Sequence, residues 1–278
     1  MSETAEVKRP VPLRESLQEI EERLGAKAEI ALFLDFDGTI SNIVPQPRDA
    51  VLGPDIRARI EALASRPDFT VAIVSGRALS DLRERAALDG IVYVGNHGLE
   101  IETGSTCFRD PRAEALRREL RSLSLQLKLA LSETDGLEIE DKGVTLSVHF
   151  RRVNEHLHDW VRSVTFSTVA RSRSFVCREG KMVLDVKPQI EWHKGYAVQW
   201  ILREIAPEGA LPVYIGDDVT DEDAFGAISE GITIRVGESG ETAAQYFLPD
   251  VAAVGQFLQW LDLAKPHASF ANSQRAGR

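Results

Sequence analysis

Short apolar runs that end in polar clusters are the feature that most restricts how this chain can fold. Five such runs lie between stretches of helical periodicity, at residues 30–34, 70–74, 91–94, 212–215 and 232–236. Buried parallel strands have this near-continuous apolar composition, and they need crossover connections that are usually helices. The pattern therefore predicts an α/β fold, a doubly wound parallel sheet with a Rossmann-like core.

The predicted helices follow the 3.6-residue repeat of apolar side chains. One begins at Pro54, two more cover 79–87 and 196–205, and others flank the sheet near each end of the chain, with apolar positions at Leu13, Leu17, Ile20 and Leu24 and at Val254, Phe257, Leu258 and Leu261. We expect an N-terminal extension with a short helix over 1–25 and a disordered tail over 265–278.

Residues 110–186 break the strand and helix rhythm. A leucine stripe predicts one long helix across 116–131, two strands at 137–140 and 145–151 surround a turn, a second helix covers 154–164, and strands at 174–178 and 182–186 follow. This predicts an α+β cap domain with an antiparallel sheet, inserted into a catalytic core of 26–109 and 187–264.

Composition excludes several classes of protein. The formal net charge of -10 disfavours nucleic acid and anionic membranes as partners. No apolar run is long enough to span a bilayer, and the first residues lack the apolar core of a signal peptide. Two cysteines are too few for a disulfide framework, so we expect a cytoplasmic protein.

Two carboxylates follow the first strand, in the sequence LFLDFDGT. In an extended segment Asp35 and Asp37 project to the same side, at the carboxyl end of a strand, where open α/β sheets bind ligands. Gly38 allows a sharp turn, and the Thr39 hydroxyl can orient a neighbour. The alternative is a turn with aspartates that cap a helix.

A second acidic cluster, GDDVTDED, follows the run at 212–215. Asp217, Asp218 and Asp221 could cap a helix N-terminus, but together with Asp35 and Asp37 they crowd negative charge at one sheet edge. A hard divalent cation relieves such repulsion, and Mg²⁺ is the natural candidate.

Two other strands also end in polar residues, Ser75 and Arg77 after one and Asn96 and His97 after the next. A hydroxyl and a guanidinium suit an oxyanion, although His97 could be a structural histidine. Lys194 begins a helix, where a cation is unfavourable without an anion nearby. A solvated surface lysine is the alternative.

These residues together favour phosphoryl transfer. Asp35 is the better nucleophile, Mg²⁺ and Lys194 would offset the charge of a phosphate, and Asp37 could protonate the leaving alkoxide and then activate water. That chemistry is a two-step phosphatase reaction.

The four motifs around Asp35, Ser75, Lys194 and Asp217 resemble those of haloacid dehalogenase-like phosphatases, and the insertion resembles their C2-type cap. More narrowly, GNHGLE at 95–100, Glu140-x-Lys142 with His149-Phe150-Arg151, the Glu179 to Lys181 run and GDDVTDEDAF are similar to trehalose-6-phosphate phosphatases.

The resemblance implies roles for these residues. Mg²⁺ would be held by Asp35, the Asp37 carbonyl and Asp217, with Asp218 and Asp221 behind them, and Ser75 and Lys194 would hold the phosphate. The remaining residues would contact the phosphate and the disaccharide: Arg77, Asn96, His97, Glu140, Lys142, Arg151, Glu179 and Lys181. The charges at 140, 142, 179 and 181 could instead be solvated hairpin charges.

The implied reaction is hydrolysis of trehalose 6-phosphate in trehalose biosynthesis, with the substrate made by a separate trehalose-6-phosphate synthase, because the chain is too short to include a glucosyltransferase domain. Three alternatives stay open: another sugar phosphatase or phosphohexomutase, a phospho-accepting signalling domain, and a catalytically silent relative.

Overall fold

The computed structural model describes residues 9–237 and 240–264. The chain forms two compact units, a core unit made of Met1–Cys107 and Trp192–Arg278, and an inserted unit, Phe108–Glu191. The domain limits predicted at 110 and 186 stay predictions. The first eight residues of the predicted N-terminal extension and the whole tail predicted at 265–278 lie outside the described residues.

The core unit contains a mixed sheet with the strand order β1-β13-β12-β11-β2-β3-β4-β5-β6. The pairs from β1 to β4 are parallel, and β5 is antiparallel to β4. The strands are β1 (Val11–Pro12), β2 (Ile30–Asp35), β3 (Phe69–Val74), β4 (Val92–Gly95), β5 (Glu100–Glu102), β6 (Cys107–Arg109), β11 (Leu211–Gly216), β12 (Ile232–Val236) and β13 (Tyr246–Leu248).

All five predicted strands occur in this sheet, so the predicted fold class is confirmed. The sheet departs from parallel pairing at one edge, where β5 is antiparallel to β4. There β5 follows β4 after a short loop, and such a connection can only return antiparallel.

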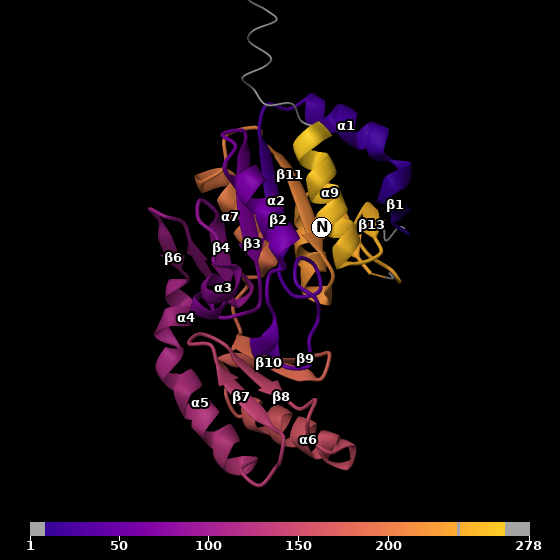
Figure 1. Ribbon diagram of the computed structural model, residues 1–278. Coiled ribbons are helices and arrows are strands. Elements are labelled where there is room, and N and C mark those ends of the chain that lie inside the picture. The colour runs from indigo at the N-terminus through magenta and orange to yellow at the C-terminus, as the bar shows by residue number, and fades with distance from the viewer. Residues whose placement is uncertain (1–8, 238–239, 265–278) are drawn as a thin grey trace, which may run out of the picture. The chain divides into compact units, whose positions relative to one another are not determined.

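Helices lie on both faces of the core sheet. Ile30, Leu32 and Leu34 belong to the apolar core that includes α2 (Pro54–Ala64) and α9 (Val251–Ala264), which lie side by side (Figure 1). On the other face Phe33 stacks against Tyr214, whose ring meets Phe225 of α8 (Glu222–Ala227) edge to face. This alternation along β2 makes the sheet doubly wound.

The other core helices are α1 (Leu17–Gly25), α3 (Leu79–Ala86) and α7 (Lys194–Glu204). The apolar repeat from Leu13 to Leu24 does not form one helix, because residues 13–15 make a separate 3₁₀ turn before α1 begins. Among the described residues, no helix has the length and apolar character that crossing a lipid bilayer requires.

The inserted unit has an antiparallel sheet in the order β7-β8-β10-β9, with helices α5 and α6 packed against each other (Figure 1). Its elements are α4 (Pro111–Ala115), α5 (Arg117–Ala130), β7 (Glu138–Asp141), β8 (Leu146–His149), α6 (His158–Val169), β9 (Phe175–Gly180) and β10 (Val183–Pro188). Its own apolar core joins α5 and α6 to one face of this sheet.

The leucine-rich helix predicted across 116–131 is present as α5, and a separate short helix, α4, precedes it. The other helix prediction in the inserted unit was wrong in extent. The second helix runs to Val169 instead of 164, because Thr165 and Val169 are buried. Burial outweighs the low helix propensity of these β-branched residues.

Candidate active site

Asp35 and Lys194 form a buried ion pair at the end of the first long strand. Asp35 ends β2 and is 4% exposed, while Lys194 begins α7 and is 2% exposed. The Lys194 Nζ donates to Asp35 Oδ1 and to Asp221 Oδ1, both at 2.7 Å. The lysine predicted to need an anion at its helix start therefore lies between two carboxylates.

Asp35, Asp217 and Asp221 bring their carboxylates together beside this lysine. One oxygen of each lies within 4.8 Å of the others. Asp221 is fully engaged, because its Oδ1 also accepts from the Tyr214 hydroxyl at 2.7 Å and its Oδ2 accepts from the Asp218 amide at 2.9 Å. Asp217 Oδ1 is buried and accepts no hydrogen bond from the described residues.

The crowding of these carboxylates changes their proton affinity. Burial raises the pKa of Asp217 to about 7, with further contributions from the charges of Asp221 and Asp218. Burial, together with the neighbouring carboxylates, also raises the pKa of Asp35 well above its usual range, despite Lys194. Burial opposes a charge on Lys194, but Asp221 and Asp35 outweigh it and raise its pKa.

The cluster fits a hard divalent cation. A divalent cation would relieve the repulsion that helps raise the pKa values of these two carboxyl groups, and it would give the buried Asp217 oxygen a partner. Because Asp221 is already engaged, Asp35 and Asp217 have the oxygens left to hold the ion.

Gly38 makes room for this cluster. It has a positive φ of 83°, and a Cβ at that position would overlap the carboxylate of Asp217. Only glycine adopts this backbone conformation without strain and also leaves space for the acid. Thr39, next to it, is fully buried, and its hydroxyl has no hydrogen-bond partner among the described residues.

Asp37 is held by Arg77. Arg77 Nε donates to Asp37 Oδ2 at 2.7 Å, and Nη2 donates to Asp37 Oδ1 at 2.6 Å. The same guanidinium reaches Asp81 Oδ2 at 2.7 Å and the Pro47 carbonyl at 2.9 Å. Arg77, predicted as a substrate contact, is thus bound to protein groups in this structure.

The loops after β3 and β4 are joined by backbone hydrogen bonds. The Asn96 amide donates to the Arg77 carbonyl at 2.7 Å, and the His97 amide donates to the Ser75 carbonyl at 3.0 Å. A Cβ on Gly76 would overlap the His97 ring. The structure therefore brings Ser75, Asn96 and His97 together, as predicted from their strand ends.

Asn96 and Asp218 also make local contacts. The Asn96 side chain donates to Glu100 Oε2 at 2.6 Å. Asp218 and Asp221 form a capping box at the start of the short helix Val219–Asp221. The capping role considered for the acidic cluster is therefore real for Asp218, alongside the contact between Asp221 and Lys194.

Five of the predicted substrate contacts lie in the inserted unit: Glu140, Lys142, Arg151, Glu179 and Lys181. Glu140 Oε2 is 3.0 Å from His149 Nε2, and Lys142 Nζ is 4.0 Å from Asp185 Oδ1. Arg151 donates from Nη2 to the Lys181 carbonyl at 3.1 Å.

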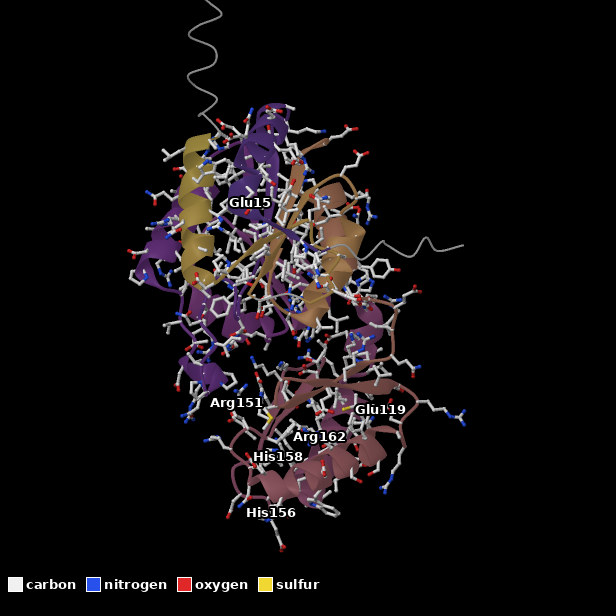
Figure 2. All side chains as sticks on the ribbon, turned by 90° about the vertical axis from the view of Figure 1, so that its right-hand side faces the viewer. Glu15, Glu119, Arg151, His156, His158 and Arg162 are labelled. Atoms are coloured by element: carbon white, nitrogen blue, oxygen red, sulfur yellow. The ribbon has the colours of Figure 1, made fainter. Side chains whose placement is uncertain are left out.

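Glu179 and Glu140 do not lie on the same face of the antiparallel sheet. Arg162 Nε of α6 donates to Glu179 Oε1 at 2.6 Å, and the Arg162 guanidinium lies over the Phe150 ring; Figure 2 labels Arg162 and Arg151. Glu179 is paired in register with Leu184, a core residue, and directly opposed residues share a face. Glu140 is paired with Ser147, which belongs to the other face. The two predicted sugar contacts therefore lie on opposite faces of one sheet.

Sequence reasoning missed several partners of these residues. Asp81 has a visible signal, since it stands four residues after Arg77 at the spacing of helical ion pairs. Tyr214 had only a weak one, a hydroxyl inside an apolar strand before the acidic cluster. Arg162 and Asp185 had none, because their partners are far away in sequence.

Comparison with known proteins gives one family. The model of the family described as trehalose-phosphatase matches residues 33–252. The matched range includes the ends of β2, β3, β4 and β11 and the whole inserted unit.

Individual relatives agree with that match. The chain is 36% identical over 243 residues to an uncharacterized glycosyl hydrolase of Mycobacterium tuberculosis, covering 83% of this chain and 18% of that protein. It is 34% identical to trehalose 6-phosphate phosphatase RA3 of Zea mays, covering 84% of this chain and 70% of that protein. The chain thus spans less than a fifth of the first relative and most of the second.

A solved structure has the same fold. The crystal structure of a trehalose-6-phosphate phosphatase related protein superposes with a TM-score of 0.75 at 25% identity, covering 84% of this chain and 97% of that one.

Proposed function

The chain belongs to the trehalose-phosphatase family, and from this premise we propose that it is a phosphomonoester hydrolase that converts trehalose 6-phosphate to trehalose and phosphate. The observation that carries the proposal is the buried ion pair of Asp35 and Lys194 beside Asp217, at the carboxyl edge of the sheet. A nucleophile, a phosphate-neutralising cation and a metal-binding carboxylate are the groups that hydrolysis through an aspartyl-phosphate needs.

In the first step Asp35 attacks phosphorus and the bond to the sugar oxygen breaks. Lys194 donates to Asp35 Oδ1 and so holds the carboxylate in place for the attack. Lys194 and Ser75 neutralise and orient the phosphoryl oxygens. Asp37 gives its proton to the leaving sugar alkoxide, so trehalose departs as a neutral alcohol.

In the second step Asp37 takes a proton from water, and the resulting hydroxide attacks phosphorus. The bond from phosphorus to Asp35 breaks, which frees phosphate and restores the carboxylate. Both steps require Asp37 to carry a proton on one oxygen, whereas Arg77 engages both oxygens here. Asp37 must therefore release at least one bond to Arg77 during turnover.

Mg²⁺ is the cofactor that we propose for this site, held by Asp35, Asp217 and the Asp37 carbonyl. When bound, it supplies charge neutralisation for the phosphate and keeps the nearby carboxylates ionised. Asp221 holds Lys194 in line with Asp35, and Tyr214 and the Asp218 amide fix Asp221 in turn.

The test is phosphate release from trehalose 6-phosphate, sucrose 6-phosphate, glucose 6-phosphate and an aryl phosphate, with Mg²⁺ or with a chelator. We expect strong preference for trehalose 6-phosphate and loss of release with chelator. Equal rates on all four substrates would contradict the preference for the disaccharide and favour a broader sugar phosphatase. A stable phosphoprotein that releases no phosphate would favour a phospho-accepting signalling domain. The absence of any phosphate transfer would favour a catalytically silent relative.

Metal binding has a separate readout in thermal unfolding. Mg²⁺ at about 100 times its Kd should stabilise the native protein by about 2.7 kcal/mol, visible as a higher Tm. Asp217→Asn removes one charged ligand, so the rise in Tm should shrink. An equal rise in Tm for both proteins would contradict Asp217 as a ligand.

A further inference from the structure

Arg77 carries a positive charge that the surrounding protein largely shields from solvent. Its side chain is only 10% exposed, and the central carbon of its guanidinium lies 5.4 Å from the centroid of the Phe36 ring. A charged group withdrawn from water needs hydrogen-bonding partners on the protein. Arg77 has two carboxylate partners, Asp37 after β2 and Asp81 of α3.

The two carboxylates use different nitrogens of the guanidinium. Nε and Nη2 of Arg77 donate to Asp37, whereas Nη1 donates to Asp81 Oδ2 at 2.7 Å. In the proposed reaction Asp37 must release at least one bond to Arg77, and its side chain is 41% exposed, which leaves it room to turn. The bond from Nη1 to Asp81 can persist while Asp37 moves.

Asp81 is itself held from its other side. Arg85, one turn further along α3, donates from Nε to Asp81 Oδ2 at 2.8 Å, and its Nη2 lies 2.7 Å from Asp81 Oδ1. Arg85 also donates to the carbonyls of Arg48 and Ala50. Burial by itself would raise the pKa of Asp81, but the hydrogen bonds from Arg85 and Arg77 outweigh burial and lower that pKa. Asp81 is therefore a fixed negative charge behind Arg77.

We infer that Asp81 is a positioning residue for the acid/base Asp37, and that it acts through the guanidinium of Arg77. The inference rests on the proposed function, which gives Asp37 the two proton transfers. Asp81 fixes the place of the guanidinium, so that Asp37 returns to the same position after each transfer. Asp81 also shares the charge of Arg77, so that Asp37 is held less tightly and can release a bond during turnover.

The choice of leaving group separates this role from general damage to the site. The alkoxide of trehalose needs a proton as it departs, whereas a stabilised aryloxide such as 4-nitrophenoxide departs without one. Hydrolysis of the aspartyl-phosphate needs Asp37 to take a proton from water, whichever substrate supplied the phosphate. Poor positioning of Asp37 therefore slows both steps with trehalose 6-phosphate, but only the second step with 4-nitrophenyl phosphate.

The experiment compares wild type with Asp81→Asn in the full chain, in steady state and by rapid mixing. Asparagine keeps the size and one acceptor for Arg77 but removes the charge. We expect kcat for trehalose 6-phosphate to fall about tenfold with KM changed by less than about twofold, because both steps slow and substrate binding does not use Asp37. With 4-nitrophenyl phosphate the first release of 4-nitrophenol should keep its wild-type rate, which also shows that the variant is folded, and the later steady release should be slower.

Each other outcome of this comparison has a definite meaning. Loss of the first release of 4-nitrophenol would overturn the inference, because the nucleophile and the phosphate site would then be damaged too. An unchanged kcat for trehalose 6-phosphate in Asp81→Asn, beside an active wild type, would refute the inference alone. A wild-type protein that releases no phosphate from trehalose 6-phosphate would refute the proposed function and the inference with it.

A double-mutant cycle tests whether Asp81 acts through Arg77. Adding Asp81→Asn to Arg77→Met should change kcat by less than about twofold, because the guanidinium that Asp81 holds is already absent. If the two substitutions lowered kcat independently, Asp81 would act without Arg77 and the inference would be wrong.

Glu61→Gln is the matched control. Glu61 of α2 pairs with Arg57 at 4.0 Å and at the same four-residue spacing, in the same unit but on a helix that carries none of the proposed catalytic residues. Its kcat should stay within about twofold of the wild-type value. A fall as large as that of Asp81→Asn would overturn the inference, because loss of any helical ion pair would then slow turnover.

Discussion

Single residues in the candidate active site depend on the space and charge that their neighbours leave. Lys194 can be buried because Asp35 and Asp221 both accept from it, and Asp217 fits where Gly38 has no side chain. A substitution at any of these positions therefore changes a local balance of charge or volume.

Asp35→Asn should remove phosphate release while the protein stays folded. The amide has nearly the same shape, and Lys194 keeps Asp221 as its partner. Burial raises the pKa of Asp35, so the charged form is costly in the metal-free protein and its loss should not lower Tm. Phosphate assays and a thermal melt in chelator check both halves. Residual release near the wild-type rate would contradict the nucleophile assignment.

Gly38→Ala should damage both stability and activity. The added Cβ overlaps the Asp217 carboxylate, and alanine at a φ of 83° costs about 1–2 kcal/mol of unfolding free energy. We expect at least about tenfold slower phosphate release, because a misplaced carboxylate loses its geometry. Gly25→Ala at the end of α1 is the control, since nothing lies within 4 Å of its added Cβ. Equal urea midpoints for the two variants would refute the packing argument.

At the scale of elements, Asp110 shows how one capping residue stabilises the start of a helix. Asp110 caps α4 and accepts from the Arg112 amide at 2.8 Å and the Ala113 amide at 3.4 Å, and its side chain also pairs with the Arg112 guanidinium. The Asp110 side chain is buried, and burial by itself would raise its pKa. The hydrogen bonds from Arg112 outweigh burial and lower the pKa of Asp110.

Asp110→Ala should lower the unfolding free energy by about 1 kcal/mol at neutral pH, because two amides lose their acceptor. A lowered folded pKa stabilises the native state above the unfolded value of about 3.9, and this stabilisation is lost as pH falls through the folded pKa. Urea unfolding should therefore show a difference between wild type and variant that shrinks below about pH 4. A difference that is constant with pH would contradict the cap.

At the scale of the molecule, each compact unit has its own apolar core. In the inserted unit Leu120 and Leu127 of α5 and Val161 of α6 join Val148 and Leu184 of the sheet. A two-layer arrangement of helices on a sheet is one that can bury a core without further elements.

We therefore expect a fragment of residues 108–191 to fold alone. Circular dichroism should show mixed helix and strand content, and urea should unfold the fragment in one cooperative transition. Leu184→Ala is the matched variant, because it opens a cavity among fully buried side chains and should lower stability by about 2–5 kcal/mol. A non-cooperative transition in the unmodified fragment would show that this unit needs the core.

The sequence by itself determined the fold class, the five long strands of the core and the residues at their ends. Apolar runs of four or five residues and 3.6-residue repeats are local signals, and parallel strands necessarily bring their carboxyl ends to one edge. Strands of two or three residues, such as β1 and β5, were missed because so short a segment has no period.

Only the tertiary structure decided which charges meet. The ion pairs of Arg77 with Asp37, of Arg162 with Glu179 and of Lys142 with Asp185 join residues distant in sequence, so no spacing predicts them. The separation of Glu179 from Glu140 follows from strand register, which packing of the apolar face fixes. Local patterns specify elements, whereas pairing between elements depends on how the whole core is filled.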